Sequence, residues 1–128
     1  MSVEAFREQR ENLMKLLFQY DFYQHDQYDK ETVYEQAVMD IYQDMIKELA
    51  VVDKLIEAAL FDYSLSRLNS VDRAIIRVAT YELLKGETPA SIVINEAIEL
   101  TKDYSDLDDE KQHKFTNKVL DTIAKNIK

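Results

Sequence analysis

The sequence predicts an all-α protein of six or seven helices in one domain spanning residues 1–128. Two observations carry this prediction. The chain contains one glycine and one proline among 128 residues, whereas a β-rich domain needs more turn residues of these kinds. Apolar residues also recur every three or four positions in one segment after another, which is the spacing of a buried helix face. A chain of this length can bury a sizeable core without metals or disulfides.

Three helices are expected in the first half of the chain. The first covers residues 4–24, and its apolar face consists of Leu13, Leu16, Leu17 and Tyr20. Thr32 and Glu35 have the spacing of a capping box, which predicts the start of a second helix. Asp53 is the expected cap of a third, shorter helix. Nothing at residues 50–52 forbids one continuous helix, so both arrangements stay open.

The segment around which the other helices are expected to pack is VDRAIIRVATYELL, residues 71–84. Its apolar stripe is wider than that of a surface helix, which predicts burial on most sides. Asn69 or Ser70 is the expected N-cap. Gly86, the only glycine, follows at the position where a left-handed C-cap residue is favoured. This segment is therefore the predicted central helix.

Two more helices are expected after it. Thr88–Pro89 begins the next one, because proline is tolerated in a first turn, where its missing N–H costs nothing. The expected inner face of that helix is Val93, Ala97, Leu100 and Tyr104. Asp106 or Asp108, in an acidic segment, would cap the last helix. In the last helix an apolar stripe lies opposite the lysines, and it consists of Phe115, Val119, Leu120, Ile123, Ala124 and Ile127.

The formal net charge of −9 is unevenly distributed. Residues 1–50 hold five lysines and arginines against eleven acidic residues, whereas residues 111–128 hold five lysines against one aspartate. So acidic a chain is a poor non-specific binder of nucleic acid, because phosphate affinity rests on cationic contacts. The lysines at the end either form a local phosphate-binding patch or simply keep one helix face solvated.

The residues that usually carry catalysis are sparse. His25 and His113 lie far apart and have no histidine or cysteine partner at metal-ligand spacing, and one glycine cannot build a phosphate loop. We therefore expect no enzymatic activity, no metal and no cofactor. The sequence shows no signal peptide and no apolar run of membrane-spanning length, which predicts a cytoplasmic protein without membrane attachment.

Some polar residues fit a simple helical bundle poorly. Asn95–Glu96 lies inside the apolar run VINEAIEL, and Asn117 lies inside the last helix. Each is explained either by a buried hydrogen bond between helices or by a binding role. Phe115, with Lys114 and Lys118 beside it, is either a core residue or a stacking platform next to phosphate-binding cations, as in recognition of single-stranded RNA.

Three segments resemble the NusB family of bacterial transcription antitermination factors in order and spacing. They are LSRLNSVDRAIIRVATYELLK (65–85), VINEAIELTK (93–102) and HKFTNKVLD (113–121), with Pro89 between the first two. The first half of the chain resembles the family more loosely, through Arg10–Glu11 and LMKLLFQYDF. The resemblance implies an all-helical fold of two packed small bundles.

The resemblance also implies a function. Members of the family bind the boxA element of nascent RNA together with ribosomal protein NusE. The complex helps RNA polymerase read through terminators, notably in ribosomal RNA operons. Expected partners are therefore boxA-type single-stranded RNA, NusE and the antitermination complex of RNA polymerase. Some family members form homodimers that cover the RNA surface, and the sequence leaves this open.

Matching positions imply two sets of site residues. The RNA-binding residues would be Arg7, Arg10, Lys114, Phe115, Asn117, Lys118 and Asp121. The lysines would contact phosphate, the phenyl ring would stack, and Asn117 and Asp121 would read base edges. The residues facing NusE would be Phe18 and Glu82, with Glu82 paired to a basic residue of the partner.

The chain departs from the family pattern in three places. Glu8 and Gln9 interrupt the basic segment of the first helix, Lys118 replaces a glycine, and Thr101 replaces an alanine. These changes bear on RNA affinity more than on the fold. The alternative function is therefore a protein-interaction module of the same fold that binds NusE with weak or no direct RNA reading. An unrelated enzyme ranks last.

Overall fold

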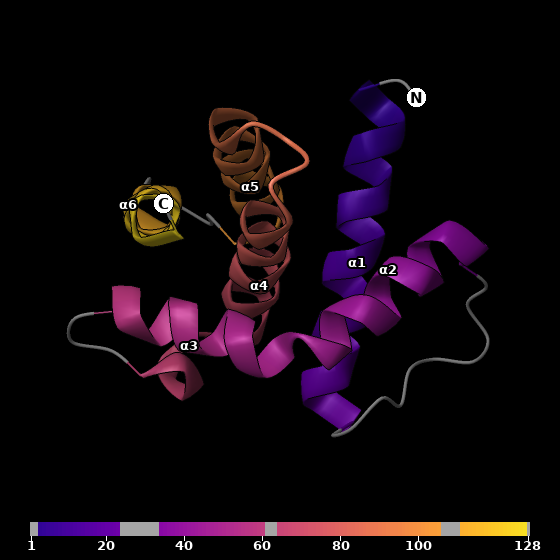
Figure 1. Ribbon diagram of the computed structural model, residues 1–128, viewed down its shortest axis with the longest axis horizontal. Coiled ribbons are helices and arrows are strands. Elements are labelled where there is room, and N and C mark those ends of the chain that lie inside the picture. The colour runs from indigo at the N-terminus through magenta and orange to yellow at the C-terminus, as the bar shows by residue number, and fades with distance from the viewer. Residues whose placement is uncertain (1–2, 24–33, 61–63, 106–110, 128) are drawn as a thin grey trace.

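The computed structural model describes residues 3–23, 34–60, 64–105 and 111–127. These residues form six α-helices and one short 3-10 helix, without a strand among them, so the all-α prediction is confirmed (Figure 1). The elements are α1 (Val3–Tyr23), α2 (Gln36–Lys47), α3 (Leu49–Ala59), η1 (Leu65–Arg67), α4 (Ser70–Lys85), α5 (Ala90–Tyr104) and α6 (Lys111–Ile127).

The helices form two small groups that meet at α4. α1 packs on α2, and α4, α5 and α6 pack on one another. Because α4 also packs against α1 and α3, it joins the two groups, as the prediction of a central helix required. In Figure 1, α4 and α5 lie between α6 and α1. The buried apolar side chains of both groups form one hydrophobic cluster.

Both ends of α4 lie where the capping residues of the sequence predict them. Asn69 is the N-cap, and its Oδ1 accepts a hydrogen bond of 2.8 Å from the backbone N–H of Asp72. Gly86 ends the helix with φ of 71°, in the left-handed region where a side chain is costly. Between these caps, ten residues of α4 are buried, which agrees with an apolar stripe that runs around most of the helix.

Two arginines of α4, the half-buried Arg73 and the buried Arg77, bind α4 to its neighbours. Arg73 donates through Nε to the carboxylate of Asp21 on α1 at 2.7 Å, and Arg77 donates to the same carboxylate at 2.8 Å. Arg73 also donates to the backbone carbonyls of Leu65 and Leu68 at 3.1 Å. These bonds hold the chain that enters α4 against the end of α1.

Some boundaries and faces differ from the sequence prediction. Asp53 is not a helix cap, because α3 begins at Leu49 and Asp53 lies inside it. The break between α2 and α3 falls at Glu48, whose backbone N–H donates hydrogen bonds to the carbonyls of Asp44 and Met45. No capping side chain marks this turn, so the sequence carried no signal for it.

Tyr104 is 39% exposed instead of buried, although the other expected inner residues of α5 are buried. α2 begins at Gln36, directly after Glu35, and its expected capping partner Thr32 lies outside the described residues. The expected caps Asp106 and Asp108, and His25, also lie outside them.

Candidate functional site

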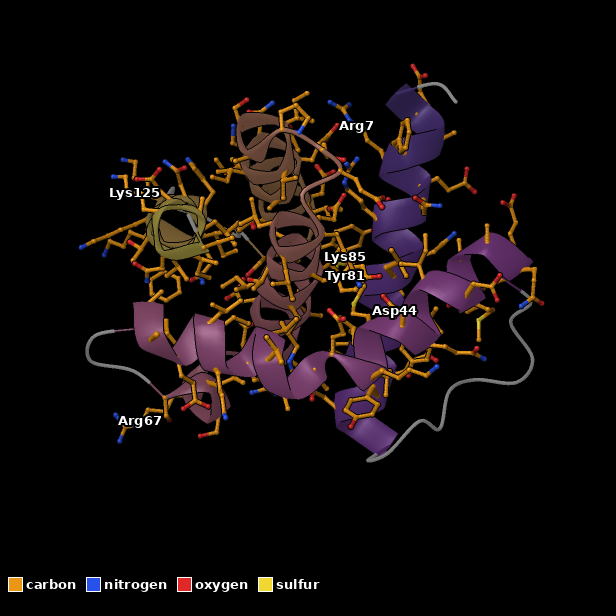
Figure 2. The ribbon with its side chains drawn as sticks, in the orientation of Figure 1. Arg7, Asp44, Arg67, Tyr81, Lys85 and Lys125 are labelled. Carbon is orange, nitrogen blue, oxygen red and sulfur yellow. The ribbon has the colours of Figure 1, made fainter. Side chains whose placement is uncertain are left out.

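α6 presents a row of lysines on one side. Lys111, Lys114, Lys118 and Lys125 are exposed, and their spacing of three, four and seven residues places them within one narrow sector of the helix. Lys125 lies on the side of α6 that faces away from α4 and α5 (Figure 2). We call this row the lysine stripe. The stripe is therefore a region of positive charge on a chain whose net charge is −9.

The other predicted RNA-binding residues of α6 lie on or beside this stripe. Phe115 is partly buried and packs against the core, so part of its ring remains accessible. Asn117 is exposed, and the exposed Asp121 forms an ion pair of 3.1 Å with Lys125. The explanation of Asn117 by a buried hydrogen bond is therefore wrong, and the same holds for Asn95, which is also exposed.

Of the polar pair Asn95–Glu96 inside the apolar run of α5, Glu96 is the residue that forms a buried hydrogen bond between helices. Its side chain is buried and accepts from Nε of Arg7 on α1, at 3.1 Å to Oε1 and 3.0 Å to Oε2. This hydrogen bond raises the pKa of Arg7 above its ordinary value. Arg7 itself remains exposed over 55% of its side chain. The carboxylate therefore fixes α1 against α5 while the tip of Arg7 stays in solvent.

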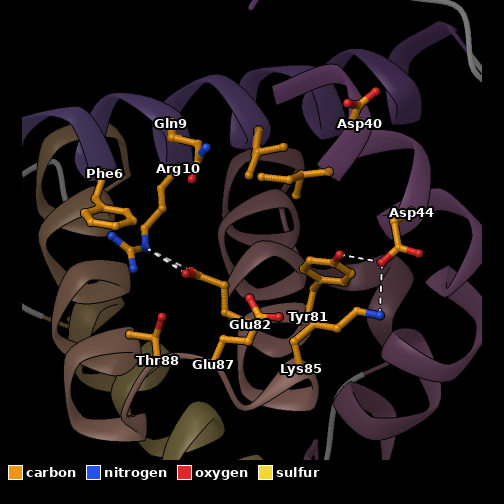
Figure 3. Close-up of a pocket in the computed structure, with 12 residues that line it drawn as sticks. Phe6, Gln9, Arg10, Asp40, Asp44, Tyr81, Glu82, Lys85, Glu87 and Thr88 are labelled. Carbon is orange, nitrogen blue, oxygen red and sulfur yellow. Dashed lines mark hydrogen bonds and ion pairs between the residues drawn. The ribbon is translucent and has the colours of Figure 1, made fainter. Parts of the chain in front are cut away.

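Arg10 and Glu82 are bonded to each other. Nε of Arg10 donates to the two carboxylate oxygens of Glu82 at 3.0 and 2.9 Å (Figure 3). The Arg10 side chain is only 7% exposed, and its guanidinium lies 5.8 Å from the centre of the Phe6 ring. The structure thus joins a residue predicted to bind RNA with a residue predicted to bind a protein partner.

A pocket of about 420 Å³ opens beside this pair, between α1, α2 and α4. On its far side, Tyr81 donates a hydrogen bond to Asp44, and Lys85 pairs with the same carboxylate at 3.0 Å (Figure 3). The hydroxyl of Tyr81 and the ammonium of Lys85 lower the pKa of Asp44. Burial, together with Asp44, raises the pKa of Tyr81. These groups form a polar contact between α2 and α4 at the pocket wall.

The predicted site residues fall in separate places. The lysine stripe and Phe115 lie on α6, whereas Arg7 and Arg10 lie on α1, and α4 and α5 lie between the two helices (Figure 1). Phe18, predicted to face NusE, is 38% exposed on α1. The structure therefore brings together Arg10 and Glu82, and it does not bring the arginines of α1 beside the lysine stripe.

Sequence reasoning missed the contact of Asp44, Tyr81 and Lys85. Tyr81 directly precedes Glu82, and Lys85 lies one helical turn after Tyr81 and Glu82. That spacing shows which residues share a face of α4, but it does not show that α2 supplies the carboxylate. Within the described residues, no group of three or more histidine, cysteine or acidic side chains could hold a metal ion. None of the described helices is long and apolar enough to cross a membrane.

Comparison with known proteins gives matches over most of the chain. The model of the NusB family matches residues 7–125. Transcription antitermination protein NusB from Staphylococcus aureus strains JH9 and Newman is 49% identical over 75 residues, which cover 59% of this chain and 56% of each relative. The match thus spans little more than half the length of these relatives.

Two solved structures have similar folds. NusB from T. maritima is 35% identical with a TM-score of 0.75, and the match covers 93% of this chain and 89% of that one. A chain in a structure described as "Crystal Structure of a Plectonemic RNA Supercoil" has a TM-score of 0.77 over 94% of both chains. At 23% identity, the second likeness shows the fold alone. The match to the family model and the T. maritima structure together show that this chain belongs to the NusB family.

Proposed function

We propose that this chain is a transcription antitermination factor. It binds boxA-type single-stranded RNA together with ribosomal protein NusE and promotes read-through by bacterial RNA polymerase, notably in ribosomal RNA operons. It acts in the cytoplasm without catalysing a reaction. Membership of the NusB family and the names of the S. aureus relatives support this function.

The lysine stripe of α6 is the observation that carries the proposal. Four ammonium groups within one sector of a helix create a local positive potential on a protein that is otherwise acidic. Between Lys111 and Lys125 the stripe is about 21 Å long at a rise of about 1.5 Å per residue. A strand of RNA can therefore meet several ammonium groups in succession, and the affinity rises with each phosphate neutralised.

In this account each predicted residue of α6 has one role. Lys114 and Lys118 contact phosphates, which sets the position of the RNA without reading its sequence. The accessible part of the Phe115 ring stacks on an unpaired base. Asn117 and Asp121 are exposed beside the lysines and hydrogen-bond to base edges, which gives sequence preference.

A second candidate function is a protein-interaction module of the same fold that binds NusE with weak or no direct RNA reading. This second function is favoured because both arginines of α1 already pair with carboxylates of this chain. Arg7 is bonded to Glu96 and Arg10 to Glu82, so carboxylates compete with phosphate for both cations. RNA affinity then depends on α6 alone.

Titration of fluorescent boxA-like RNA, with and without NusE, at two salt concentrations separates the two candidates. Specific binding that tightens with NusE and weakens with salt is the result expected for the antitermination factor. Failure of RNA to bind even with NusE present, while NusE itself binds, would contradict direct RNA binding and leave the interaction module.

A further inference from the structure

Asp72 is a buried carboxylate in the first turn of α4, and only 1% of the residue is exposed. Its Oδ2 accepts hydrogen bonds from Nδ2 of Asn69, at 2.6 Å, and from Nε2 of Gln112. Its Oδ1 accepts a hydrogen bond of 2.6 Å from the hydroxyl of Ser105. All three donors are neutral. Since a carboxylate is costly to remove from water, these donors are what makes its burial tolerable.

Capping of α4 accounts for only part of this arrangement. Asn69 caps the helix with its own side chain, and a carboxylate in the first turn is favourable because of the helix dipole. An aspartate in solvent would supply the same effect. Burial of Asp72 instead brings in Ser105, the C-cap of α5, and Gln112, the second residue of α6. The carboxylate therefore joins the start of α4 to the end of α5 and to the start of α6.

The first turn of α6 has no buried side chain of its own. Residues 111–114 are exposed or half-buried, and the first buried residue of the helix is Thr116. Helix ends open locally at a low cost in free energy unless other contacts hold them. The hydrogen bond from Gln112 to Asp72 is such a contact, and it holds the first turn of α6 on α4.

Gln112 lies on the inner face of α6 and outside the lysine stripe. It precedes the buried Thr116 by four residues and the buried Val119 by seven, which is the spacing of one helix face. At about 100° per residue, it lies at least about 100° around the helix from each lysine of the stripe. Gln112 therefore acts on the stripe through the position of the helix, and not by its own contact with RNA.

We infer that Asp72 is a positioning residue of the RNA-binding surface. Through Gln112 it fixes the first turn of α6, so that Lys111, Lys114 and Phe115 are in place before RNA binds. This inference rests on the proposed function, because it concerns the same surface of α6. Without the contact, the turn and its long side chains must be ordered when RNA binds, which costs about tenfold in affinity.

The test compares Gln112→Met with Asn69→Ala. Both variants remove one donor to Oδ2 of Asp72, but only Gln112 belongs to α6. The affinity for boxA-like RNA is measured with NusE present, over a series of salt concentrations. We expect Gln112→Met to bind about tenfold more weakly with an unchanged salt slope, because every phosphate contact still forms in the complex. We expect Asn69→Ala to lose stability with its cap and to keep the RNA affinity of the wild type.

Hydrogen exchange of the free protein gives a second measurement. The backbone amides of residues 115–118 bond to the carbonyls of the first turn of α6, so they report whether that turn is closed. Their exchange should be faster in Gln112→Met than in the wild type and unchanged in Asn69→Ala. A purely structural role of the contact would lower the free energy of unfolding without this local change and without loss of RNA affinity.

Asp72→Asn separates the geometry of the contact from its charge. The Oδ1 of an asparagine can accept from Gln112, and its amide can donate to the hydroxyl of Ser105, which is able to accept. Asp72→Asn should therefore keep RNA affinity near that of the wild type, whereas Asp72→Ala should bind as weakly as Gln112→Met. Where Asp72→Ala does not fold, Gln112→Met alone carries the comparison.

Two results would overturn the positioning role alone. One is wild-type RNA affinity in Gln112→Met, and the other is an equal loss of RNA affinity in Gln112→Met and Asn69→Ala. Failure of the wild type to bind boxA-like RNA even with NusE present would overturn the proposed function, and the positioning role with it.

Discussion

Arg77 on α4 holds Asp53 on α3 by two parallel hydrogen bonds. Nε donates to Oδ1 and Nη2 donates to Oδ2, both at 2.9 Å. Nη1 of the same guanidinium donates to Asp21 on α1 at 2.8 Å. One buried arginine therefore ties together α1, α3 and α4. Burial alone would lower the pKa of Arg77, but Asp53 and Asp21 raise it above its ordinary value.

Removal of Arg77 should destabilise the protein strongly. Arg77→Ala leaves the partly buried carboxylate of Asp53 without its cation, whereas Asp21 keeps Arg73, and breaking such a pair costs about 3–5 kcal/mol in comparable cases. Arg67→Ala is the matched control, because Arg67 is exposed on η1 (Figure 2) and should change stability by less than about 0.5 kcal/mol. Urea unfolding of both variants measures the difference. Equal stabilities of the two variants would show that the three-helix contact contributes little.

Thr80→Val should leave stability unchanged or increase it by up to about 1 kcal/mol. Thr80 is fully buried, and its hydroxyl has no hydrogen-bond partner within the described part of the chain. Replacement of an unpaired buried hydroxyl by a methyl group removes a desolvation cost. Thr101→Val is the control, because the Thr101 hydroxyl donates to the carbonyl of Ala97 at 2.9 Å. Thermal unfolding should show Thr101→Val to be the less stable variant. The opposite order would refute the claim that the buried hydroxyl of Thr80 costs stability.

The contact of Asp44 with Tyr81 and Lys85 should make the free energy of unfolding depend on pH in the acidic range. Tyr81 and Lys85 lower the pKa of Asp44 below its ordinary value of 3.8. The ionised form is therefore favoured in the folded state, and its contribution is present above pH 3.8 and is lost as the pH falls through the lowered pKa. The stability difference between wild type and Asp44→Asn should shrink as the pH falls from 7 through this range.

Urea unfolding at several pH values measures this difference. Asp40→Asn is the control on the same helix, since Asp40 accepts a hydrogen bond from Gln36 and pairs with no described cation. If the Asp44→Asn difference stays constant down to the acid limit of folding, Asp44 does not stabilise the fold through its charge.

Gly86→Ala should cost about 1–2 kcal/mol. Gly86 has φ of 71°, and an added Cβ would meet no atom within 4 Å. The cost therefore comes from the left-handed backbone alone. Gly86→Asn should cost less, because asparagine tolerates this conformation better. Thermal unfolding of the two variants ranks them, and equal losses would point to a cause other than the backbone.

The features predicted correctly from the sequence are those set within one helix. The caps of α4, the apolar stripes apart from Tyr104, and the row of lysines all follow from spacing along the chain. Asn69 and Gly86, for example, need no knowledge of neighbouring helices, because a cap acts on its own backbone.

The features that sequence reasoning missed depend on which helices pack together. Asp53 looked like a cap because aspartate is common there, yet its carboxylate is required by Arg77 of another helix. Arg10 and Glu82 were assigned to two different binding surfaces, and the packing of α1 on α4 joins them. Helical spacing gives the face of a residue but not its partner across an interface.

The salt dependence of RNA binding in Lys114→Glu tests the central claim most directly. The variant is compared with Lys47→Glu, which makes the same change of net charge on α2. With NusE present, we predict that Lys114→Glu weakens boxA-like RNA binding and lowers the salt slope by about 0.7, the value for one lost phosphate contact, while Lys47→Glu changes neither. If the two variants bind RNA with equal affinity and equal slope, the lysine stripe of α6 is not the RNA-binding surface.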